Sequence, residues 1–419
     1  MKLFNKRVYY LYFALFCFIV FCINLTSSYI QYKNFMDIGE QEIIAKVELV
    51  YTKTNESNKT YKILRLKTNG FSFYTVPRKN INFKPFDELK LTVINLDVKF
   101  IDYLRGVFYM PSNGITPLEQ SKTPNLRQKA LNFISLQHEN DKISSLFMAL
   151  FLGAAVSKEL RDDISHWGMA HLVAISGYHL GVIMGVVFLL LAPVYRYFGA
   201  RFFPYRSYKF DISVIGFALL CFYFYMIGFM PSFLRAFTMS IFGFILLCRN
   251  IKILSFNTLF IVVCFCVALF PSLLFNIGFY FSCAGVFYIF LYLHYFKDKF
   301  SILTHSLLLN FYVFLAMEVS VLYFFPLISF QQIAVIPLSY IFILFYPLSF
   351  ILHLFEYGGI CDERLAWFLS FKLSFTNATI PLLVFLGYNL LSFLAIKFKA
   401  VMLTLPLLGA LCFIIFCIF

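Results

Sequence analysis

The sequence predicts a polytopic α-helical membrane protein of about ten spans with an inserted small all-β domain. The 419 residues are 61% hydrophobic and only 13% charged, and the mean hydropathy of +0.79 lies outside the usual soluble range. Apolar runs of spanning length recur through the second half of the chain. One polar stretch near the N-terminus has instead the short alternating pattern of β-strands.

The chain opens with three basic residues, followed by an apolar run over residues 8–25. A spanning helix needs about 20 such residues, and positive flanks stay in the cytoplasm. We therefore expect residues 1–30 to be a retained N-terminal anchor that starts in the cytoplasm. A cleaved signal peptide is the alternative, because residues 26–28 are small and follow the apolar core.

Residues 31–120 form the predicted β domain, which the anchor would place outside the cytoplasm. Four or five segments rich in Val, Ile, Thr and aromatic residues follow one another without room for a helical layer. Asn69-Gly70 between two of them is a type I′ hairpin signal. This pattern predicts a small closed barrel or sandwich of OB-like type.

The formal net charge of +14 favours contact with nucleic acid or anionic lipid. An AT-rich genome produces the same excess of Lys, Asn, Ile, Phe and Tyr, so charge is informative only where it clusters. One such cluster lies in residues 31–130, which hold 16 basic and 10 acidic residues and are net +6.

The rest of the chain divides into a connection and a membrane domain. A hinge marked by Pro111, Gly114, Pro117 and Pro124 leads into residues 121–165, which are expected to be an amphipathic connection. Residues 166–419 hold nine further apolar runs, several of them short or interrupted by Pro or Gly. With the first run they make about ten predicted spans.

Polar residues interrupt the apolar half most clearly at HLVAISGYHLG, from His171 to Gly181. A polar group in hydrocarbon costs about 1 to 7 kcal/mol unless it finds a partner or lines water, so this cluster is a candidate site. Gly177 and Gly181 favour a broken or re-entrant segment along a water-filled path. The alternative is two histidines that bond neighbouring helices as structural groups, and their spacing is not one of the recurrent metal-ligand spacings.

The segment GMAHLVAISGYHLG resembles the signature of ComEC-type competence proteins, the inner-membrane channels that carry transforming DNA into the bacterial cytoplasm. Upstream, ALFLGAAVSKELRDDISHWGMAH resembles the family's approach to that signature. Two later segments resemble further blocks in the same order, and the β domain, ending in YLRGV, matches the position of the family's OB-like domain. The similarity covers residues from about 40 to 400. The residues that match in these blocks are Leu152, Gly153, Leu160, Arg161, Gly228, Pro231, Ser232, Arg235, Ala236, Pro271, Gly278, Phe279 and Ser282.

Larger family members carry a C-terminal metallo-β-lactamase-like domain, proposed to be a nuclease, whose metal site needs a tight HxHxDH cluster. None of the seven histidines here lies within two residues of another. The chain therefore resembles a short form that lacks this domain. We expect no enzymatic activity, no metal and no cofactor.

The resemblance implies translocation of single-stranded DNA through the bacterial inner (plasma) membrane during natural transformation. Single-stranded DNA is charged at every nucleotide, so its path must supply water, polar groups and positive potential. The expected partners are single-stranded DNA, membrane lipids, a periplasmic DNA receptor and a separate cytoplasmic ATP-driven motor, because no Walker-type GKS or GKT motif is present. A homo-oligomer is left open. The predicted path residues are His171, Ser176, Gly177, His179, Ser232, Arg235, Gly278 and Ser282.

Two further groups of residues are candidates for contact or coupling. OB-like domains bind single strands with a basic groove and stacked aromatics, which here predicts contacts from Lys62, Arg65, Lys67, Tyr74 and Arg78. Glu318 is the lone acid of its apolar run, and a carboxylate would repel DNA. We expect it to have a structural partner such as Arg235 or a histidine, with proton coupling as the alternative.

Two other functional classes stay open. The first is an integral membrane enzyme that acts on a lipid-linked or polymeric substrate through His171 and His179. The second is a small-solute transporter.

Overall fold

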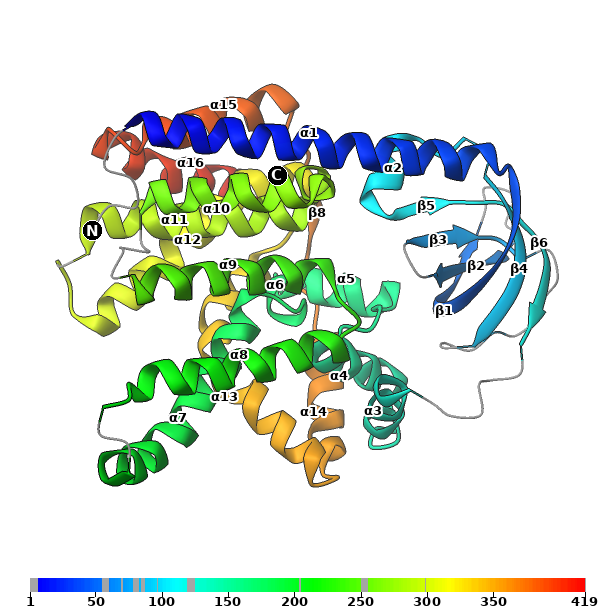
Figure 1. The fold of residues 1–419 in the computed structure, drawn as a ribbon, viewed down its shortest axis with the longest axis horizontal. Helices are drawn as coiled ribbons and strands as arrows, with labels where there is room; N and C mark the ends of the chain where they lie inside the picture. The colour runs from blue at the N-terminus through cyan, green and yellow to red at the C-terminus, as the bar shows by residue number, and fades with distance from the viewer. Residues whose placement is uncertain are drawn as a thin grey trace.

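The computed structural model describes residues 7–54, 60–68, 71–77, 83, 87–95, 97–118, 125–202, 205–249, 255–297 and 299–418. A bundle of long helices carries a β domain at one end (Figure 1). The first helix, α1 (Arg7–Asp37), runs along the bundle and continues into the β domain.

Helix α1 joins the membrane part to the β domain without a break. Its 31 residues correspond to about 46 Å, whereas the hydrocarbon core is about 30 Å thick. Asn24 Nδ2 donates to the carbonyl of Ala268 at 2.7 Å within the bundle. Beyond it, Tyr32 Oη donates to the carbonyl of Val98 at 2.7 Å, and Phe35 enters the core of the β domain. The last turns of α1 are therefore held by packing on the sheet.

The β domain is a six-stranded sheet with the order β5-β3-β2-β1-β4-β6, antiparallel except between β3 and β5. The alternation of side chains along β2 defines the two faces of the sheet. Leu64 and Leu66 are fully buried, while Arg65 and Lys67 point away from the core. The predicted β domain is confirmed, whereas its OB-like closure stays a prediction. Asn69-Gly70 and Arg78 lie outside the described residues. The elements are β1 (Glu40–Thr54), β2 (Thr60–Lys67), β3 (Ser72–Thr75), β4 (Glu88–Ile94), α2 (Phe100–Arg105), β5 (Val107–Tyr109) and β6 (Ser112–Pro117).

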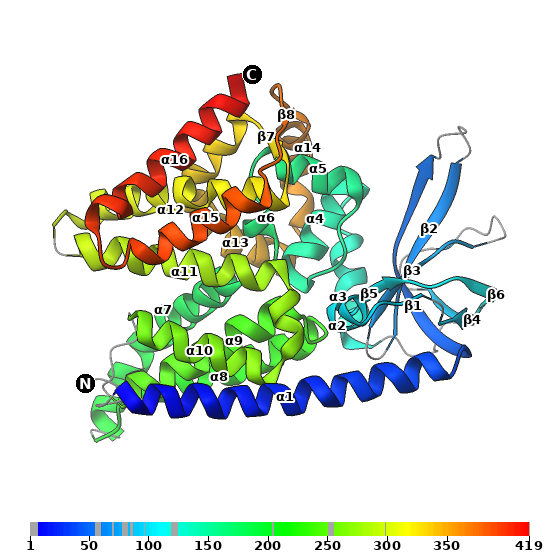
Figure 2. The same ribbon diagram turned by 90° about the horizontal axis from the view of Figure 1, so that it is seen from above.

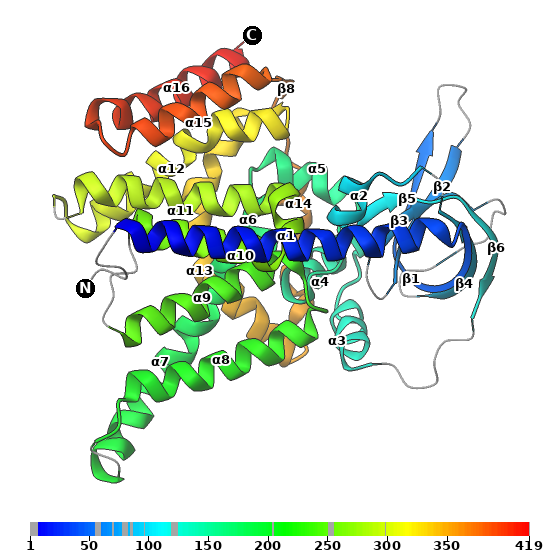
Figure 3. The ribbon, with the colours of Figure 1, turned by 45° about the horizontal axis from the view of Figure 1, so that its top comes forward.

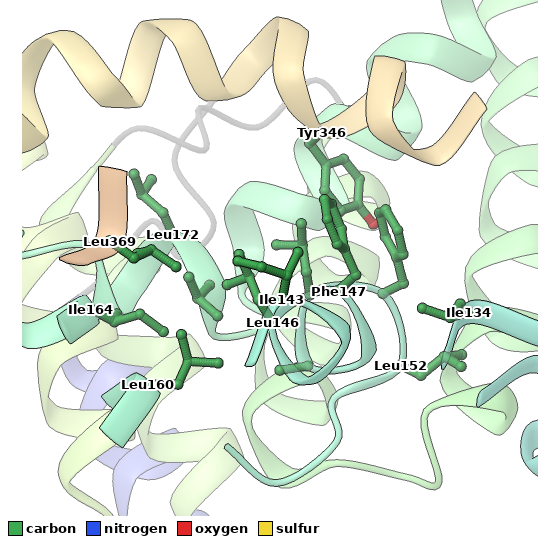
Figure 4. Close-up of a cluster of buried hydrophobic side chains, with 14 of the residues drawn as sticks. Ile134, Ile143, Leu146, Phe147, Leu152, Leu160, Ile164, Leu172, Tyr346 and Leu369 are labelled. Carbon is green, nitrogen blue, oxygen red and sulfur yellow. The ribbon is translucent and has the colours of Figure 1, made fainter. Parts of the chain in front are cut away.

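Four short helices connect the β domain to the long ones: α3 (Leu126–Ser135), α4 (Asp141–Leu152), α5 (Lys158–His166) and α6 (Ala170–Val173). Their apolar faces form one core with α13 (Val335–Leu354) and α14 (Asp362–Ser370), shown in Figure 4. Phe147 and Ile143 lie at the centre of this core and are almost fully buried.

The remaining helices are long and apolar. Among the described residues, seven helices are long and apolar enough to cross a membrane, and three shorter apolar helices accompany them. This confirms a largely helical chain compatible with a multi-pass membrane protein, whereas the count of ten spans stays a prediction. The elements are α7 (Gly177–Phe202), α8 (Tyr208–Met226), α9 (Pro231–Cys248), α10 (Phe256–Leu269), η1 (Pro271–Phe275), α11 (Ile277–Phe296), α12 (Ile302–Phe324), β7 (Leu327–Ile328), η2 (Phe330–Ala334), η3 (Gly358–Cys361), β8 (Thr376–Asn377), α15 (Leu382–Leu394) and α16 (Lys399–Ile418).

Candidate functional site

The signature segment is broken into two helices. Helix α6 ends at Val173, Ala174 is extended with a ψ of 128°, and α7 starts at Gly177. Ser176 Oγ accepts a hydrogen bond from the backbone N–H of Tyr178 at 3.3 Å, so it satisfies one free donor of the new helix. The break predicted from the glycines is therefore observed.

His179 is fully buried, immediately after this break. Its Nδ1 accepts a hydrogen bond from the backbone N–H of Ser176 at 3.4 Å, and its ring contacts Phe342 and Tyr346 of α13 at 5.7 and 4.8 Å. Its Nε2 has no hydrogen-bond partner among the described residues. These contacts place His179 in the aromatic packing between α7 and α13.

The signature's other polar side chains lie in different surroundings. His171 is exposed on α6, and within the described chain no hydrogen bond joins it to His179. Two imidazoles in separate environments are not arranged as an acid–base pair. Tyr178 Oη donates to the carbonyl of Ser339 on α13 at 2.8 Å, so this hydroxyl has a structural partner.

Helix α9 is where the sequence blocks meet. It contacts α7, α8, α10 and α11 and lies between the α7–α8 pair and α11 in Figure 3. A Cβ at Gly177 would lie 3.7 Å from that of Ala236, and one at Gly153 would overlap the sulfur of Met230. From the other side, Phe279 of α11 packs in one cluster with residues of α9 and α10. Segments far apart in sequence thus form one contiguous region.

The remaining predicted path residues lie on α9 and α11. Ser232 and Arg235 fall in the first turns of α9, and their side chains are outside the described part. Gly278 is exposed and Ser282 is half-buried in the first turns of α11. The structure therefore brings Gly177 next to Ala236 of α9.

Glu318 lies on α12 and is 3% exposed. Its Oε1 has no hydrogen-bond partner in the described part of the chain. Gly409 of α16 lies beside it, since a Cβ at Gly409 would come within 3.5 Å of the Glu318 Cβ. A pairing with Arg235 or a histidine stays a prediction.

The outer face of the β sheet gathers three of the predicted DNA contacts. Arg65 pairs with Tyr74 across β2 and β3, and its guanidinium lies 5.9 Å from the centre of the Tyr74 ring. Lys67 lies opposite Ser72 on the same face. Alternation along β2 places Lys62 on the other face, with the buried Leu64 and Leu66. Tyr51 of β1 makes an edge contact with Tyr74 at 6.5 Å. Basic and aromatic side chains therefore alternate over β1, β2 and β3.

This face extends toward the helical bundle through Arg127 and Arg161, two arginines outside the predicted set of DNA contacts. Burial lowers the pKa of Lys67, Glu48 opposes that shift, and the charges of Arg127 and Arg65 lower the pKa further. Burial raises the pKa of Tyr51, and the nearby charge of Arg161 on α5 opposes it. Arg161 also belongs to a sequence block that resembles the family, whereas in sequence Arg127 is one basic residue among the 16 of residues 31–130.

Arg127 links the β domain to the region around α9. Its Nη2 donates to the carbonyl of Leu152, the last residue of α4, at 3.1 Å. A Cβ at Gly228, just before α9, would lie 3.6 Å from its Nη1. Gly228 also has a left-handed φ of 71°, which favours glycine. One cation thus contacts both the end of α4 and the connection between α8 and α9.

The sequence comparisons agree with these blocks. The model of a family described as "Competence protein" matches residues 150–418. Recombination protein 2 of Haemophilus influenzae is 29% identical over 212 residues, a match that covers 48% of this chain and 26% of that protein. The match therefore spans about a quarter of the relative's length. No solved structure matches the chain.

Proposed function

This chain belongs to the competence protein family, and on that premise we propose that it passes single-stranded DNA across the bacterial inner membrane during natural transformation. The observation that carries the proposal is the continuity of the basic face. Arg65 and Lys67 on the sheet are followed by Arg127, which contacts the turn before α9. A DNA strand bound to the β domain would thereby be guided to the region around α9, where the sequence blocks shared with the family lie together.

The basic face has the chemistry that single strands require. Stacking on an aromatic ring contributes about 1–3 kcal/mol per base and tolerates any sequence, and cations follow the phosphates. Tyr74 and Tyr51 supply rings beside Arg65. In this proposal the chain binds and passes DNA and does not cleave it.

Charge at the opposite end of the bundle supports the orientation. The ends of α7, α11 and α15 lie on the same side as the start of α1 in Figure 2, and this side carries exposed cations. Because cytoplasmic connections are enriched in Lys and Arg, we infer that this end faces the cytoplasm and the β domain faces outward. The exposed cations are Arg196, Arg201, Arg206, Lys209, Arg249, Lys297, Lys299, Lys397 and Lys399.

Transport through the bundle would use the region around α9. The break between α6 and α7 leaves backbone groups free of helix hydrogen bonds, which is tolerated at membrane depth where protein or water surrounds them. His179 is enclosed by aromatic rings, so in this proposal it holds α7 against α13 while neighbouring residues line the path. We propose two separate partner proteins. One is a receptor that delivers the DNA, and the other is an ATP-driven motor that pulls it.

Binding of a labelled single-stranded oligonucleotide to the full-length protein in detergent tests the first step. We expect affinity to fall with salt, and Arg65→Gln to weaken binding and reduce the salt slope by about 0.7, the change for one phosphate contact on a single strand. Lys90→Gln is the matched control, because Lys90 lies on β4 and pairs with Glu42 at 2.9 Å. Salt-independent binding, or equal effects of the two substitutions, would contradict the proposal.

A further inference from the structure

Glu48 occupies an irregular position in the sheet. Val47 pairs with Leu66 and Leu49 with Arg65, so Glu48 is the extra residue of a β-bulge in β1. Bulges redirect side chains and are common beside functional sites. Here the bulge leaves Glu48 on the basic face described above.

The Glu48 carboxylate is surrounded by donors from two strands. Oε2 lies 3.0 Å from Arg65 Nε, and Ser72 Oγ donates to the same oxygen at 3.4 Å. Oε1 lies 3.9 Å from Lys67 Nζ. Arg127, from α3, also interacts electrostatically with Glu48. Two cations and one hydroxyl therefore lie within 4 Å of a single anion, and a third cation interacts with it at longer range.

Other ion pairs of the β domain differ from this arrangement. Lys46–Glu88 and Lys90–Glu42 each join one lysine to one glutamate at 2.9 Å. Around Glu48 the cations exceed the anion by two charges. A guanidinium, an ammonium and a hydroxyl that converge on one anion form the donor set that binds phosphate oxygens.

The site is also accessible. The side chains of Glu48 and Arg65 are 23% and 24% exposed, and that of Lys67 is 41% exposed. Tyr74 lies beside Arg65 and offers a ring to an adjacent base. A phosphodiester can therefore approach the donors that Glu48 now contacts.

We propose that the Glu48 carboxylate occupies the position that a phosphate group of a bound nucleic acid takes. In the free protein its carboxylate occupies the site formed by Arg65, Lys67 and Ser72, and a phosphodiester of single-stranded nucleic acid displaces it. This inference rests on the proposed function. Since the displaced carboxylate stays near the bound phosphate, it lowers the affinity of the site for the DNA strand and speeds release of that strand.

The test measures affinity of the full-length protein for a labelled single-stranded oligonucleotide at fixed salt. We expect Glu48→Gln to tighten binding about fivefold, because loss of a partly exposed ion pair is worth about 1 kcal/mol. The control is Glu42→Gln, which removes the same charge from the same strand about 20 Å away at 3.3 Å per residue. It should change affinity by less than about twofold.

Two further variants make the test decisive. Glu48→Asp keeps the charge but withdraws the carboxylate by one methylene, so it should also tighten binding, and it replaces Glu48→Gln if that variant does not fold. In an Arg65→Gln background the gain from Glu48→Gln should disappear, because the two residues act as a pair. Equal affinities of wild type, Glu48→Gln and Glu48→Asp, together with salt-sensitive binding, would overturn the inference alone. Absence of salt-sensitive binding by the wild type would overturn the proposed function with it.

Discussion

Nε2 of His138 lies 3.0 Å from Nε2 of His353, in a buried contact between the α3–α4 connection and the end of α13. His353 Nδ1 lies 2.6 Å from the carbonyl oxygen of Ser349, which can only accept. In a neutral His353 ring, Nε2 must then accept from His138. Nδ1 of His138 faces a carboxylate oxygen of Asp362 at 2.8 Å. Polar contacts therefore run from Asp362 through His138 and His353 to the carbonyl of Ser349.

The first prediction concerns Asp362. Asp362→Asn removes the carboxylate whose oxygens lie 2.8 and 3.1 Å from Nδ1 of the buried His138 ring, and a hydrogen bond to a charged group contributes about 1.5–3 kcal/mol. We expect a clear fall in the thermal unfolding midpoint of the protein in detergent. Glu363→Gln, at the next and exposed position, should leave the midpoint unchanged. Equal shifts in both variants would show that the pair is not formed.

The second prediction concerns the crossing of α12 and α16. A Cβ at Gly409 would overlap the backbone carbonyl oxygen of Leu315, so Gly409→Ala must separate the helices. Overpacking of this kind costs about 1–3 kcal/mol. Gly387 on α15 is the control, since a Cβ there meets no atom within 4 Å. Gly387→Ala should be neutral or slightly stabilising in the same unfolding assay, and a Gly409→Ala protein as stable as the wild type would disprove the close crossing.

The third prediction concerns orientation. In a cysteine-free background, Tyr109→Cys on β5 should react with a membrane-impermeant thiol reagent in intact spheroplasts, because its side chain is 54% exposed on the β domain. Lys397→Cys, between α15 and α16, should react only after the membrane is opened. The reverse pattern would place the β domain in the cytoplasm. It would contradict the orientation inferred from the charge distribution.

Local patterns predicted much of the fold. Strand alternation separates Leu64 and Leu66 from Arg65 and Lys67, and the small residues of the signature predict the break that precedes Gly177. The end of α1 at Asp37 was not predictable in this way. Its last turns are polar in sequence and are held by Tyr32 and Phe35, which pack on the β domain.

Long-range contacts account for what the sequence did not reveal. His138 and His353 are 215 positions apart, and each occurs alone in its segment. Arg127 lies far in sequence from both Gly228 and Lys67, so its place between them depends on the docking of two domains. Composition can predict that a domain is basic, but it cannot predict which acidic residue contacts the basic residues of that domain.

The central claim is that the chain passes DNA into the cytoplasm. The most direct measurement follows labelled transforming DNA in a strain whose gene for this protein is deleted. We expect labelled DNA to enter the periplasm normally and none to reach the cytoplasm, with transport restored by the wild-type gene. Unaffected transformation, or labelled DNA in the cytoplasm of the deletion strain, would contradict the account.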